Sequence, residues 1–345
     1  MEAQGLQSLG FLGEQPRVYR YWRQFWFLIA LVTVLFVALM AGLFGPRNAA
    51  HSFLAVVRPN VTTTIVLFLM AYSLDSSRLR DSLRRPAGAL WGSAVNLGLL
   101  PLVSAACAQG LSLRDFSLGL MIASVSPCTL ATASVFTRRA GGNDAISLLV
   151  TLLTNIACVV LTPLWLHALV SQQAEIDIAG IVRQLVLCVL LPTLVGQMCL
   201  WPQVGRDLAE RYRAHIGFVS QLMVMLIVAV AAVSAGLELR VQPVWPSFGN
   251  MATMAAMCFL VHTAGLAAGW YGGELWRLAP EDRIATAIAG SQKTLPVGLL
   301  IATNPSVVPP GLPFVAFPLL MYHAIQLVMD TAIADAWRTR RSASM

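Results

Sequence analysis

Long apolar segments separated by short charged or polar stretches constrain the fold of this chain more than any other feature of its sequence. About ten such segments can be recognised, over residues 24–46, 61–74, 87–108, 116–137, 143–170, 179–201, 216–237, 249–271, 284–304 and 313–336. A helix needs roughly 20 residues to cross about 30 Å of hydrocarbon. Only 11% of the residues are charged, whereas a soluble domain carries about 25%. The sequence therefore predicts an all-α integral membrane protein with about ten transmembrane helices, and it excludes a soluble enzyme and a nucleic-acid-binding protein.

Arginine is distributed unequally between alternate connections of these segments. If the N-terminus is cytoplasmic, the connections on the opposite side hold only Arg47, Arg58, Arg114, Arg183 and Arg240. Loops rich in arginine and lysine are retained in the cytoplasm. We therefore expect a multi-pass protein of the cell (plasma) membrane with both termini cytoplasmic, as a polar tail over residues 1–23 and a second tail over residues 338–345. The first apolar segment has full length, so we expect it to be retained rather than cleaved as a secretion signal.

Two of the segments are interrupted by proline and polar residues at mid-membrane. The fourth contains Ser126-Pro127-Cys128-Thr129, and the ninth reads SQKTLPVG from Ser291 to Gly298. Proline lacks a backbone donor and clashes with the preceding turn, so we expect both helices to be broken there. Unwound backbone is tolerated at membrane depth only where it is buried in protein or lines a wet cavity.

The two interruptions fall five segments apart, at the fourth position of each half of the chain. An odd number of spans turns the second half upside down relative to the first. We therefore expect two inverted five-helix repeats, over residues 24–170 and 179–337. Interrupted helices at matching positions of such repeats are typical of the substrate and ion site of a transporter. Two ordinary proline kinks are the alternative.

Two charged side chains, Lys293 and Asp330, lie well inside predicted spans, and Lys293 is the only lysine of the chain. A lysine at the centre of a membrane helix costs about 2.5–3.5 kcal/mol on insertion scales, so it needs acceptors, which the freed carbonyls of a broken helix can supply. A lysine locked permanently to carbonyls or to Asp330 is the structural alternative to a functional one. Asp330 lies near the end of the last segment, where exposure to cytoplasmic water is the alternative to a role in a site.

Further polar side chains share faces of predicted spans. Ser147, Thr151 and Asn155 are spaced four residues apart and therefore lie on one helix face. Helix packing through small hydroxyl residues gives the same pattern, but hydroxyl and amide oxygens also suit a weakly held monovalent cation. His262 and His323 lie deep in the eighth and tenth segments, where they either satisfy hydrogen bonds or take part in protonation.

Several of these residues stand in motifs that occur in a fixed order. They are Asn96 shortly before a proline, the loop TRRAGGNDA over residues 137–145, the run HTAG that begins at His262, and the pair Tyr322-His323. In this order they resemble the bile acid:sodium symporter superfamily over essentially the whole chain. The resemblance implies that helices one, two, six and seven form a panel and the others a core, with broken helices four and nine crossing beside cation sites. A rocking or elevator motion of panel against core would give alternating access.

The sequence departs from the sodium-coupled members of that superfamily at residues that the resemblance would assign to sodium. Ile288 stands where they carry a glutamate, and Cys128-Thr129 replaces a pair of glycines. Lys293 follows Gln292, which is similar to a branch of the superfamily with Lys-Thr or Lys-Ser in this motif. Our hypothesis is therefore that the ammonium of Lys293 fills the place of one sodium ion.

The candidate site residues follow from the interruptions, the polar faces and the resemblance together. The candidate substrate- and ion-binding residues are Asn96, Thr129, Thr132, Ser134, Ser147, Thr151, Asn155, Ser291, Gln292, Lys293 and Thr294, with Thr132, Ser147 and Thr151 as candidate Na⁺ ligands and His262, His323 and Asp330 as supporting residues.

We expect a secondary transporter for an organic, amphipathic and anionic solute, because Lys293 and the helix N-termini at the breaks favour negative groups. Coupling to Na⁺, coupling to H⁺ and uncoupled transport are the alternatives, and no cofactor is expected.

A membrane-embedded enzyme is disfavoured because no acidic or histidine cluster at metal spacing and no Gly-x-Ser-x-Gly element occurs. A non-transporting regulator or sensor is the remaining alternative, since a fold does not fix a function. The expected partners are a small organic solute and the lipid bilayer, and the sequence leaves the oligomeric state open.

Overall fold

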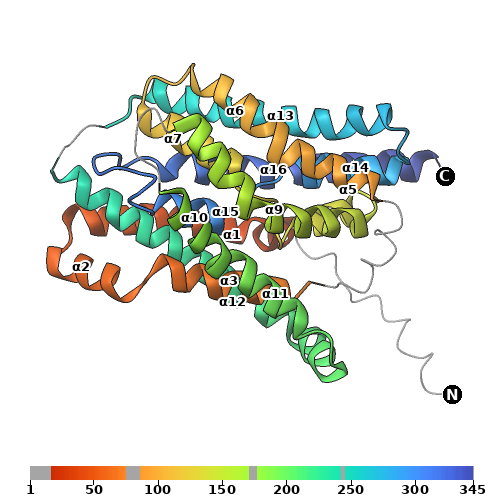
Figure 1. Ribbon diagram of the computed structural model, residues 1–345, viewed down its shortest axis with the longest axis horizontal. Coiled ribbons are helices and arrows are strands. Elements are labelled where there is room, and N and C mark those ends of the chain that lie inside the picture. The colour runs from red at the N-terminus through yellow and green to blue at the C-terminus, as the bar shows by residue number, and fades with distance from the viewer. Residues whose placement is uncertain (1–16, 75–85, 171–176, 242–244, 345) are drawn as a thin grey trace.

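The computed structural model describes residues 17–74, 86–170, 177–241 and 245–344. Within these ranges every regular element is a helix, and most helices follow the long axis of the molecule (Figure 1). The first half of the chain forms α1 (Arg17–Phe44), α2 (Arg47–Val56), α3 (Pro59–Tyr72), α5 (Ala87–Ala94), the π-helical turn η2 (Val95–Leu99), α6 (Leu100–Ala108), α7 (Arg114–Val125), α8 (Ala133–Arg139) and α9 (Asp144–Val170). The second half forms α10 (Ile178–Leu185), the π-helical turn η3 (Val186–Leu190), α11 (Leu191–Met198), α12 (Gln203–Leu239), α13 (Phe248–Leu275), α14 (Pro280–Ser291), α15 (Leu295–Ala302) and α16 (Ala316–Ser344).

The number of membrane spans differs from the expected ten. Of the described residues, 8 helical runs are long and apolar enough to cross a membrane, and there are up to 9 if α2 and α3, which meet at 47°, count as one span. The predicted fourth segment is not among them, because it is divided into α7 with 12 residues and α8 with 7 residues. Each piece alone is too short to cross the hydrocarbon. The ninth predicted segment is counted, as Pro280–Ala302, and residues 284–301 within it are all buried inside the protein.

Several helix ends also lie away from the predicted limits of the apolar segments. α2 occupies residues between the first two predicted segments, and α12 begins at Gln203, well before residue 216. α16 continues to Ser344, so the expected C-terminal tail over residues 338–345 is helical up to that residue. Of the expected N-terminal tail, residues 17–23 belong to α1 and the rest lies outside the described residues. Apolarity marks the hydrocarbon thickness rather than the end of a helix, so polar turns can continue beyond it.

The helices pack in two groups that make most of their contacts internally. In the first group α1, α2 and α3 pack against α12, and α11 packs against α3. The second group consists of α5, α6, α7, α8, α9, α13, α14 and α16. The groups meet where α10 contacts α9 and where α15 contacts both α3 and α12.

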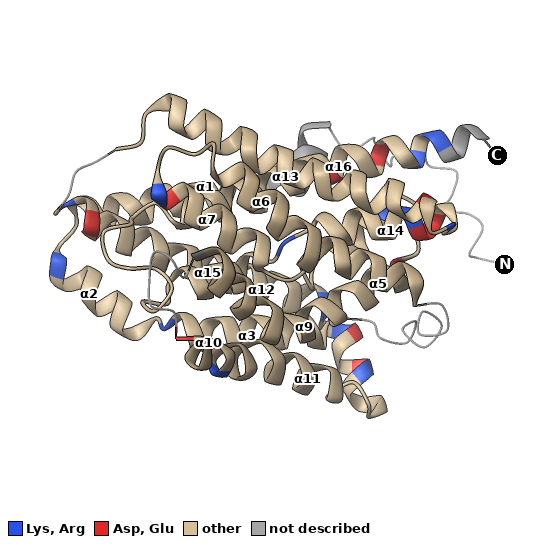
Figure 2. Cartoon of the chain, turned by 45° about the horizontal axis from the view of Figure 1, so that its top comes forward, with Lys and Arg blue, Asp and Glu red and all other residues tan. Residues whose placement is uncertain are grey.

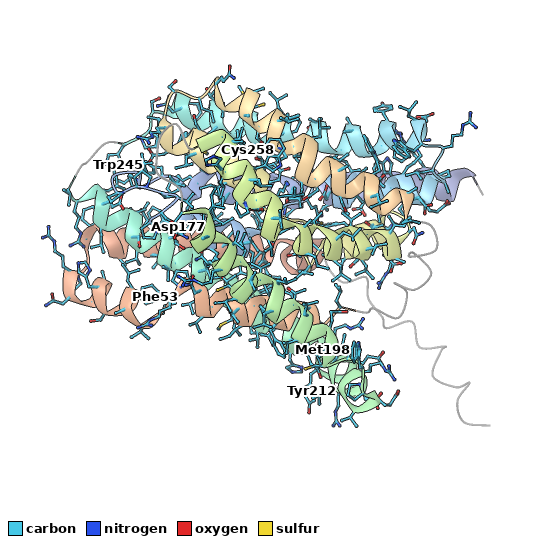
Figure 3. All side chains as sticks on the ribbon, viewed as in Figure 1. Phe53, Asp177, Met198, Tyr212, Trp245 and Cys258 are labelled. Atoms are coloured by element: carbon cyan, nitrogen blue, oxygen red, sulfur yellow. The ribbon has the colours of Figure 1, made fainter. Side chains whose placement is uncertain are left out.

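Charged residues gather at the two ends of this helical bundle, and very few occur in the stretch between them among the described residues (Figure 2). Large apolar side chains are exposed along the bundle, including Phe36 at 62% exposure and Met198 at 53%, the second of which is labelled in Figure 3. An apolar outer belt between two charged ends is the arrangement that a lipid bilayer requires. The chain is therefore a multi-pass membrane protein. Lys293 and Asp330 lie inside the belt, where they are 3% and 0% exposed.

Candidate functional site

The two predicted interruptions are present, and they lie against each other. The backbone is non-helical between α7 and α8 and again between α14 and α15. The amide of Thr294 donates to the carbonyl of Pro127 at 2.9 Å, which joins the two breaks directly. Residues far apart in the chain thus form one buried centre in the middle of the bundle.

Side chains of α9 satisfy several of the backbone groups that the first break sets free. The hydroxyl of Thr162 donates to the carbonyl of Val125 at 2.6 Å, and Asn155 Nδ2 donates to the carbonyl of Cys128 at 2.9 Å. The amide of Cys128 donates to Thr154 Oγ1 at 3.1 Å. Unpaired backbone groups are costly in a membrane, so the polar face predicted on the fifth segment supports the broken helix.

The ammonium of Lys293 occupies a nest of oxygens at the junction of the two breaks. Its Nζ donates to the carbonyls of Ser124 at 2.5 Å, Asn96 at 2.6 Å and Ser126 at 2.9 Å. Asn96 Oδ1 lies at 3.2 Å and adds a fourth oxygen. Hydrogen bonds from a charged donor contribute about 1.5–3 kcal/mol each, so this nest can offset the cost of placing the charge in the membrane.

Pro101 explains why the Asn96 carbonyl is free to accept from Lys293. In the π-helical turn the amide of Leu100 bonds to the carbonyl of Val95. The following amide, which would be the π-helical partner of the Asn96 carbonyl, belongs to Pro101 and carries no hydrogen. A π-turn inside an α-helix is frequently found at a functional site.

Side chains of α16 and η2 hold the second break. Gln326 accepts from the Lys293 amide at 2.9 Å and donates to the Lys293 carbonyl at 3.0 Å. Tyr322 Oη donates to the carbonyl of Ser291 at 2.7 Å, and Asn96 Nδ2 donates to the carbonyl of Gln292 at 2.8 Å. Hydrogen bonds from α16 on one side and from η2 on the other therefore hold the unwound segment between α14 and α15.

A buried histidine–aspartate pair adjoins the same strand. Asp330 Oδ2 accepts from Gln292 Nε2 at 2.6 Å, and its other oxygen lies 3.1 Å from His262 Nε2. Asp330 is fully buried, so the alternative that it faces cytoplasmic water is wrong for this structure. The second histidine, His323, bonds Gln326 through Nδ1 at 2.9 Å and makes an edge-to-face contact with Phe27 of α1.

The candidate Na⁺ ligands are only partly brought together. Thr151 Oγ1 donates to the carbonyl of Ser147 at 2.9 Å and lies 3.4 Å from the carbonyl of Thr129. Thr132 Oγ1 instead donates to Gln292 Oε1 at 2.9 Å. Among the described residues, no group of three or more His, Cys, Asp or Glu side chains could hold a metal. Any cation here would be bound by hydroxyl, amide and carbonyl oxygens.

Three polar atoms of the predicted set are buried and find no hydrogen-bond partner among the described residues. They are Ser147 Oγ, Asn155 Oδ1 and Thr294 Oγ1. A buried oxygen without a partner costs about 1–3 kcal/mol, so each is an acceptor for a cation or a water molecule. Ser134, by contrast, lies on α8, and no hydrogen bond joins it to this network among the described residues.

One expectation about charge needs correction. Lys293 is 3% exposed and bound by four oxygens, so in this structure it does not offer its charge to a solute. Ile288, four residues before Gln292, is fully buried in an apolar cluster with Ile284 and Ala334. The buried centre holds the ammonium of Lys293 with neutral oxygens. The carboxylate beside it, Asp330, belongs to α16.

Several residues that hold the breaks were not among the candidate site residues predicted from the sequence. They are Ser124, Ser126, Thr154, Thr162, Tyr322 and Gln326. A signal for two of them was present, because Tyr322, Gln326 and Asp330 are spaced four residues apart and share one face of α16. Ser124 and Ser126 act through backbone carbonyls, for which a residue pattern gives no signal.

Comparison with known proteins assigns this arrangement to a family. The family model described as the SBF-like CPA transporter family (DUF4137) matches residues 25–339. The chain is 21% identical over 343 residues to Sodium/bile acid cotransporter 7-A of Xenopus laevis, covering 94% of this chain and 95% of that protein. It is 25% identical over 288 residues to the Probable sodium/metabolite cotransporter BASS1, chloroplastic, of Arabidopsis thaliana, covering 82% of this chain and 68% of that protein. The chain therefore belongs to the SBF-like CPA transporter family.

Proposed function

We propose that the protein is a secondary transporter of the bile acid:sodium symporter type, which moves an organic, amphipathic anion across the plasma membrane by alternating access. Membership of a transporter family supports this proposal, as do relatives named for cotransport of sodium with metabolites or bile acids. The observation that carries it is the pair of broken helices joined at mid-membrane through Lys293. A static protein has no evident need for unwound backbone there.

In the proposed architecture ten spans form two inverted five-helix repeats. The panel comprises α1, the α2–α3 pair, the run from α10 to α11, and α12, while the other helices form the core with the two breaks. The two packing groups support this division. Transport would then proceed as the core moves against the panel, exposing the solute to one side of the membrane at a time.

Coupling in this proposal depends on how many cation sites the chain retains. The Lys293 ammonium replaces one Na⁺ in the nest formed by Asn96 and the first break. A second Na⁺ is bound near Thr132, Ser147 and Thr151, and the unpartnered Ser147 hydroxyl supports that location. H⁺ is the alternative coupling ion, with the buried pair of His262 and Asp330 as its carrier.

Uptake by reconstituted protein tests the proposed function. The full chain is placed in liposomes, and uptake of radiolabelled cholate is measured with an inward Na⁺ gradient, an inward H⁺ gradient, or neither. We expect saturable uptake above that of protein-free liposomes, increased by one of the two gradients. Folded protein without uptake under any gradient would contradict transport of this anion and favour the alternative of a non-transporting regulator or sensor on the same fold.

A further inference from the structure

The burial of Lys293 raises the question of which residues recognise a negative solute. Its charge is satisfied by protein oxygens, so anion recognition requires another basic site. Two polar cavities lie at the end of the molecule that carries Arg47 and Arg240. One has a volume of about 390 Å³ and the other about 740 Å³.

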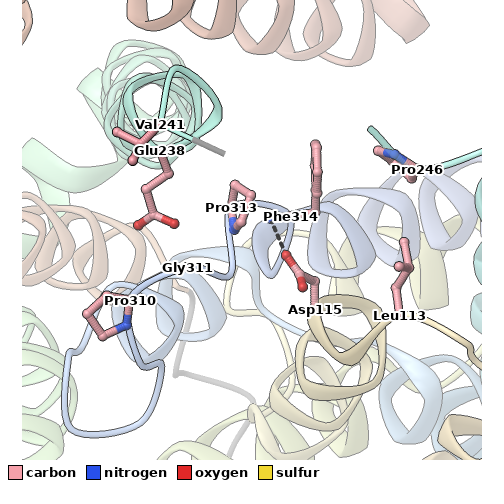
Figure 4. Close-up of a pocket in the computed structure, with 9 residues that line it drawn as sticks. All are labelled: Leu113, Asp115, Glu238, Val241, Pro246, Pro310, Gly311, Pro313 and Phe314. Carbon is pink, nitrogen blue, oxygen red and sulfur yellow. Dashed lines mark hydrogen bonds between the residues drawn. The ribbon is translucent and has the colours of Figure 1, made fainter. Parts of the chain in front are cut away.

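The smaller cavity is unsuited to an anion. Two carboxylates, Asp115 and Glu238, line it together with prolines and apolar side chains (Figure 4). Asp115 Oδ2 accepts from the amide of Phe314 at 2.8 Å, and burial raises the pKa of this carboxyl. None of the described residues that line this cavity is basic, so it offers no positive charge to a negative group.

The larger cavity, which we name the arginine cavity, has the opposite character. Arg58 and Arg183 both line it, and both side chains are exposed. Asp177 at the start of α10 (Figure 3) is the one carboxylate among the described residues that line it, and its Oδ1 accepts from the Gly180 amide at 2.8 Å. The helix N-termini of α3 and α10 begin at this cavity and add positive potential.

The position of the arginine cavity links it to the boundary between the two packing groups. A chain of amides crosses its lining: Gln184 of α10 donates to Asn60 of α3, and Asn304, which follows α15, donates to Gln184, both at 2.8 Å. α3 and α10 are helices of the proposed panel, whereas Asn304 follows the second broken helix. A molecule in this cavity therefore contacts both parts that would move in alternating access.

We propose that the arginine cavity is the entry site that binds the acidic group of the transported solute through the guanidinium groups of Arg58 and Arg183. This inference rests on the proposed transport function and specifies its substrate class as an organic acid with a carboxylate or sulfonate group. A planar guanidinium matches such a group with two parallel hydrogen bonds. The apolar part of the solute would then face the boundary between the groups.

Binding of cholate to the purified full chain in non-ionic detergent, by titration calorimetry, tests this proposal without requiring transport. The variants are the double substitution Arg58→Gln with Arg183→Gln and the control Arg47→Gln, which removes an exposed arginine at the same end that does not line the cavity. We expect equal affinity in the wild type and the control and at least a tenfold weaker affinity in the double variant. Added NaCl should weaken wild-type binding because it screens the charges.

A second double variant, Arg58→Lys with Arg183→Lys, keeps both charges and removes the planar donors. We expect its affinity to lie between those of the wild type and the glutamine variant. Unchanged affinity in the glutamine variant, or absence of saturable cholate binding by the wild type, overturns the arginine cavity as an anion site. Intact, arginine-dependent binding without uptake into liposomes instead counts against transport and leaves the anion site standing.

Discussion

Lys293 shows how a single charged residue can be accommodated at mid-membrane without a carboxylate partner. Three backbone carbonyls and one amide oxygen surround its ammonium, and each carbonyl comes from a helix interrupted by a π-turn or a break. This is the kind of oxygen nest that a dehydrated monovalent cation also uses. The sequence left open whether Lys293 is locked to carbonyls or takes the place of a cation. Both descriptions apply, because its ammonium is held by carbonyls at a position where a cation would bind.

Lys293→Ala should destabilise the protein and make it sensitive to sodium. The carbonyls of Asn96, Ser124 and Ser126 would lose their donor, at a cost of about 1–3 kcal/mol for each group left unpaired. We expect a lower melting temperature that rises again with NaCl but not with N-methylglucamine chloride, because Na⁺ can enter the emptied nest. Ser134→Ala on α8 is the control and should melt like the wild type. A Lys293→Ala protein with the same melting temperature in NaCl and in N-methylglucamine chloride would argue against the hypothesis that the ammonium replaces Na⁺. Solute uptake by this variant that is unchanged in rate and in ion dependence would also argue against it.

Gln326→Leu should weaken the second break without touching any charge. The substitution leaves the amide and the carbonyl of Lys293 without partners, at about 1–3 kcal/mol for each group. The measurement is thermal unfolding of the purified variant in detergent. Thr263→Val serves as the control, because the Thr263 hydroxyl bonds only its own helix, at the carbonyl of Phe259. A Gln326→Leu protein as stable as the control would show that the two hydrogen bonds between Gln326 and the Lys293 backbone contribute little to stability.

At the scale of elements, the broken helix α14–α15 depends on close packing against α13. A Cβ at Gly269 would lie 2.5 Å from both the Ala287 Cα and the Thr286 carbonyl oxygen, and one at Gly265 would lie 2.9 Å from the Ser291 Cα. Small residues allow such close approach between membrane helices. The π-turn η2 also connects two elements, since it leaves the carbonyl of Asn96 free to accept from Lys293 between α14 and α15.

Gly269→Ala should therefore separate α13 from α14. Both atoms that a Cβ would meet belong to the backbone, so they cannot move aside as a flexible side chain would. Overpacking of this kind costs about 1–3 kcal/mol, which unfolding in detergent would detect as a lower melting temperature. Gly217→Ala on α12, where a Cβ meets nothing within 4 Å, should be neutral or slightly stabilising, because alanine favours a helix over glycine by about 0.5–1 kcal/mol. Equal stability of the two variants would contradict the importance of this contact.

At the scale of the whole molecule, the charged ends define two faces (Figure 2). One face carries Arg138, Arg139, Arg283 and Arg338 beside acidic partners, including Arg139 with Asp335 at 2.7 Å. The arginine cavity lies at the opposite face. The bias of arginine toward the first face predicts that this face is cytoplasmic.

Reporter fusions should give opposite results at the two faces. We expect green fluorescent protein fused after residue 345 to fluoresce and alkaline phosphatase at the same position to be inactive, because the C-terminus is predicted to be cytoplasmic. Fusions truncated at Gly110, in the connection between α6 and α7, should show the reverse. An active phosphatase at the C-terminus would reject the predicted orientation and would place the arginine cavity on the cytoplasmic side.

The sequence by itself determined the helices and the places where they break. Apolar length identified the membrane helices to within a few turns, and the prolines and polar residues at Pro127 and after Ser291 located both interruptions, because these are local properties of the backbone. The segment over residues 116–137 was nevertheless counted as one membrane span, although α7 and α8 are each too short to cross the membrane. Apolarity alone does not show how far a helix unwinds at a break. Only the tertiary structure decided that Lys293 is enclosed by oxygens, that Asp330 is fully buried, and that Arg58 and Arg183 share one cavity. The physical reason is that these contacts join residues of different helices, from 38 positions apart for Gln292 and Asp330 to 197 for Asn96 and Lys293, and local periodicity does not specify which distant segment will supply a partner.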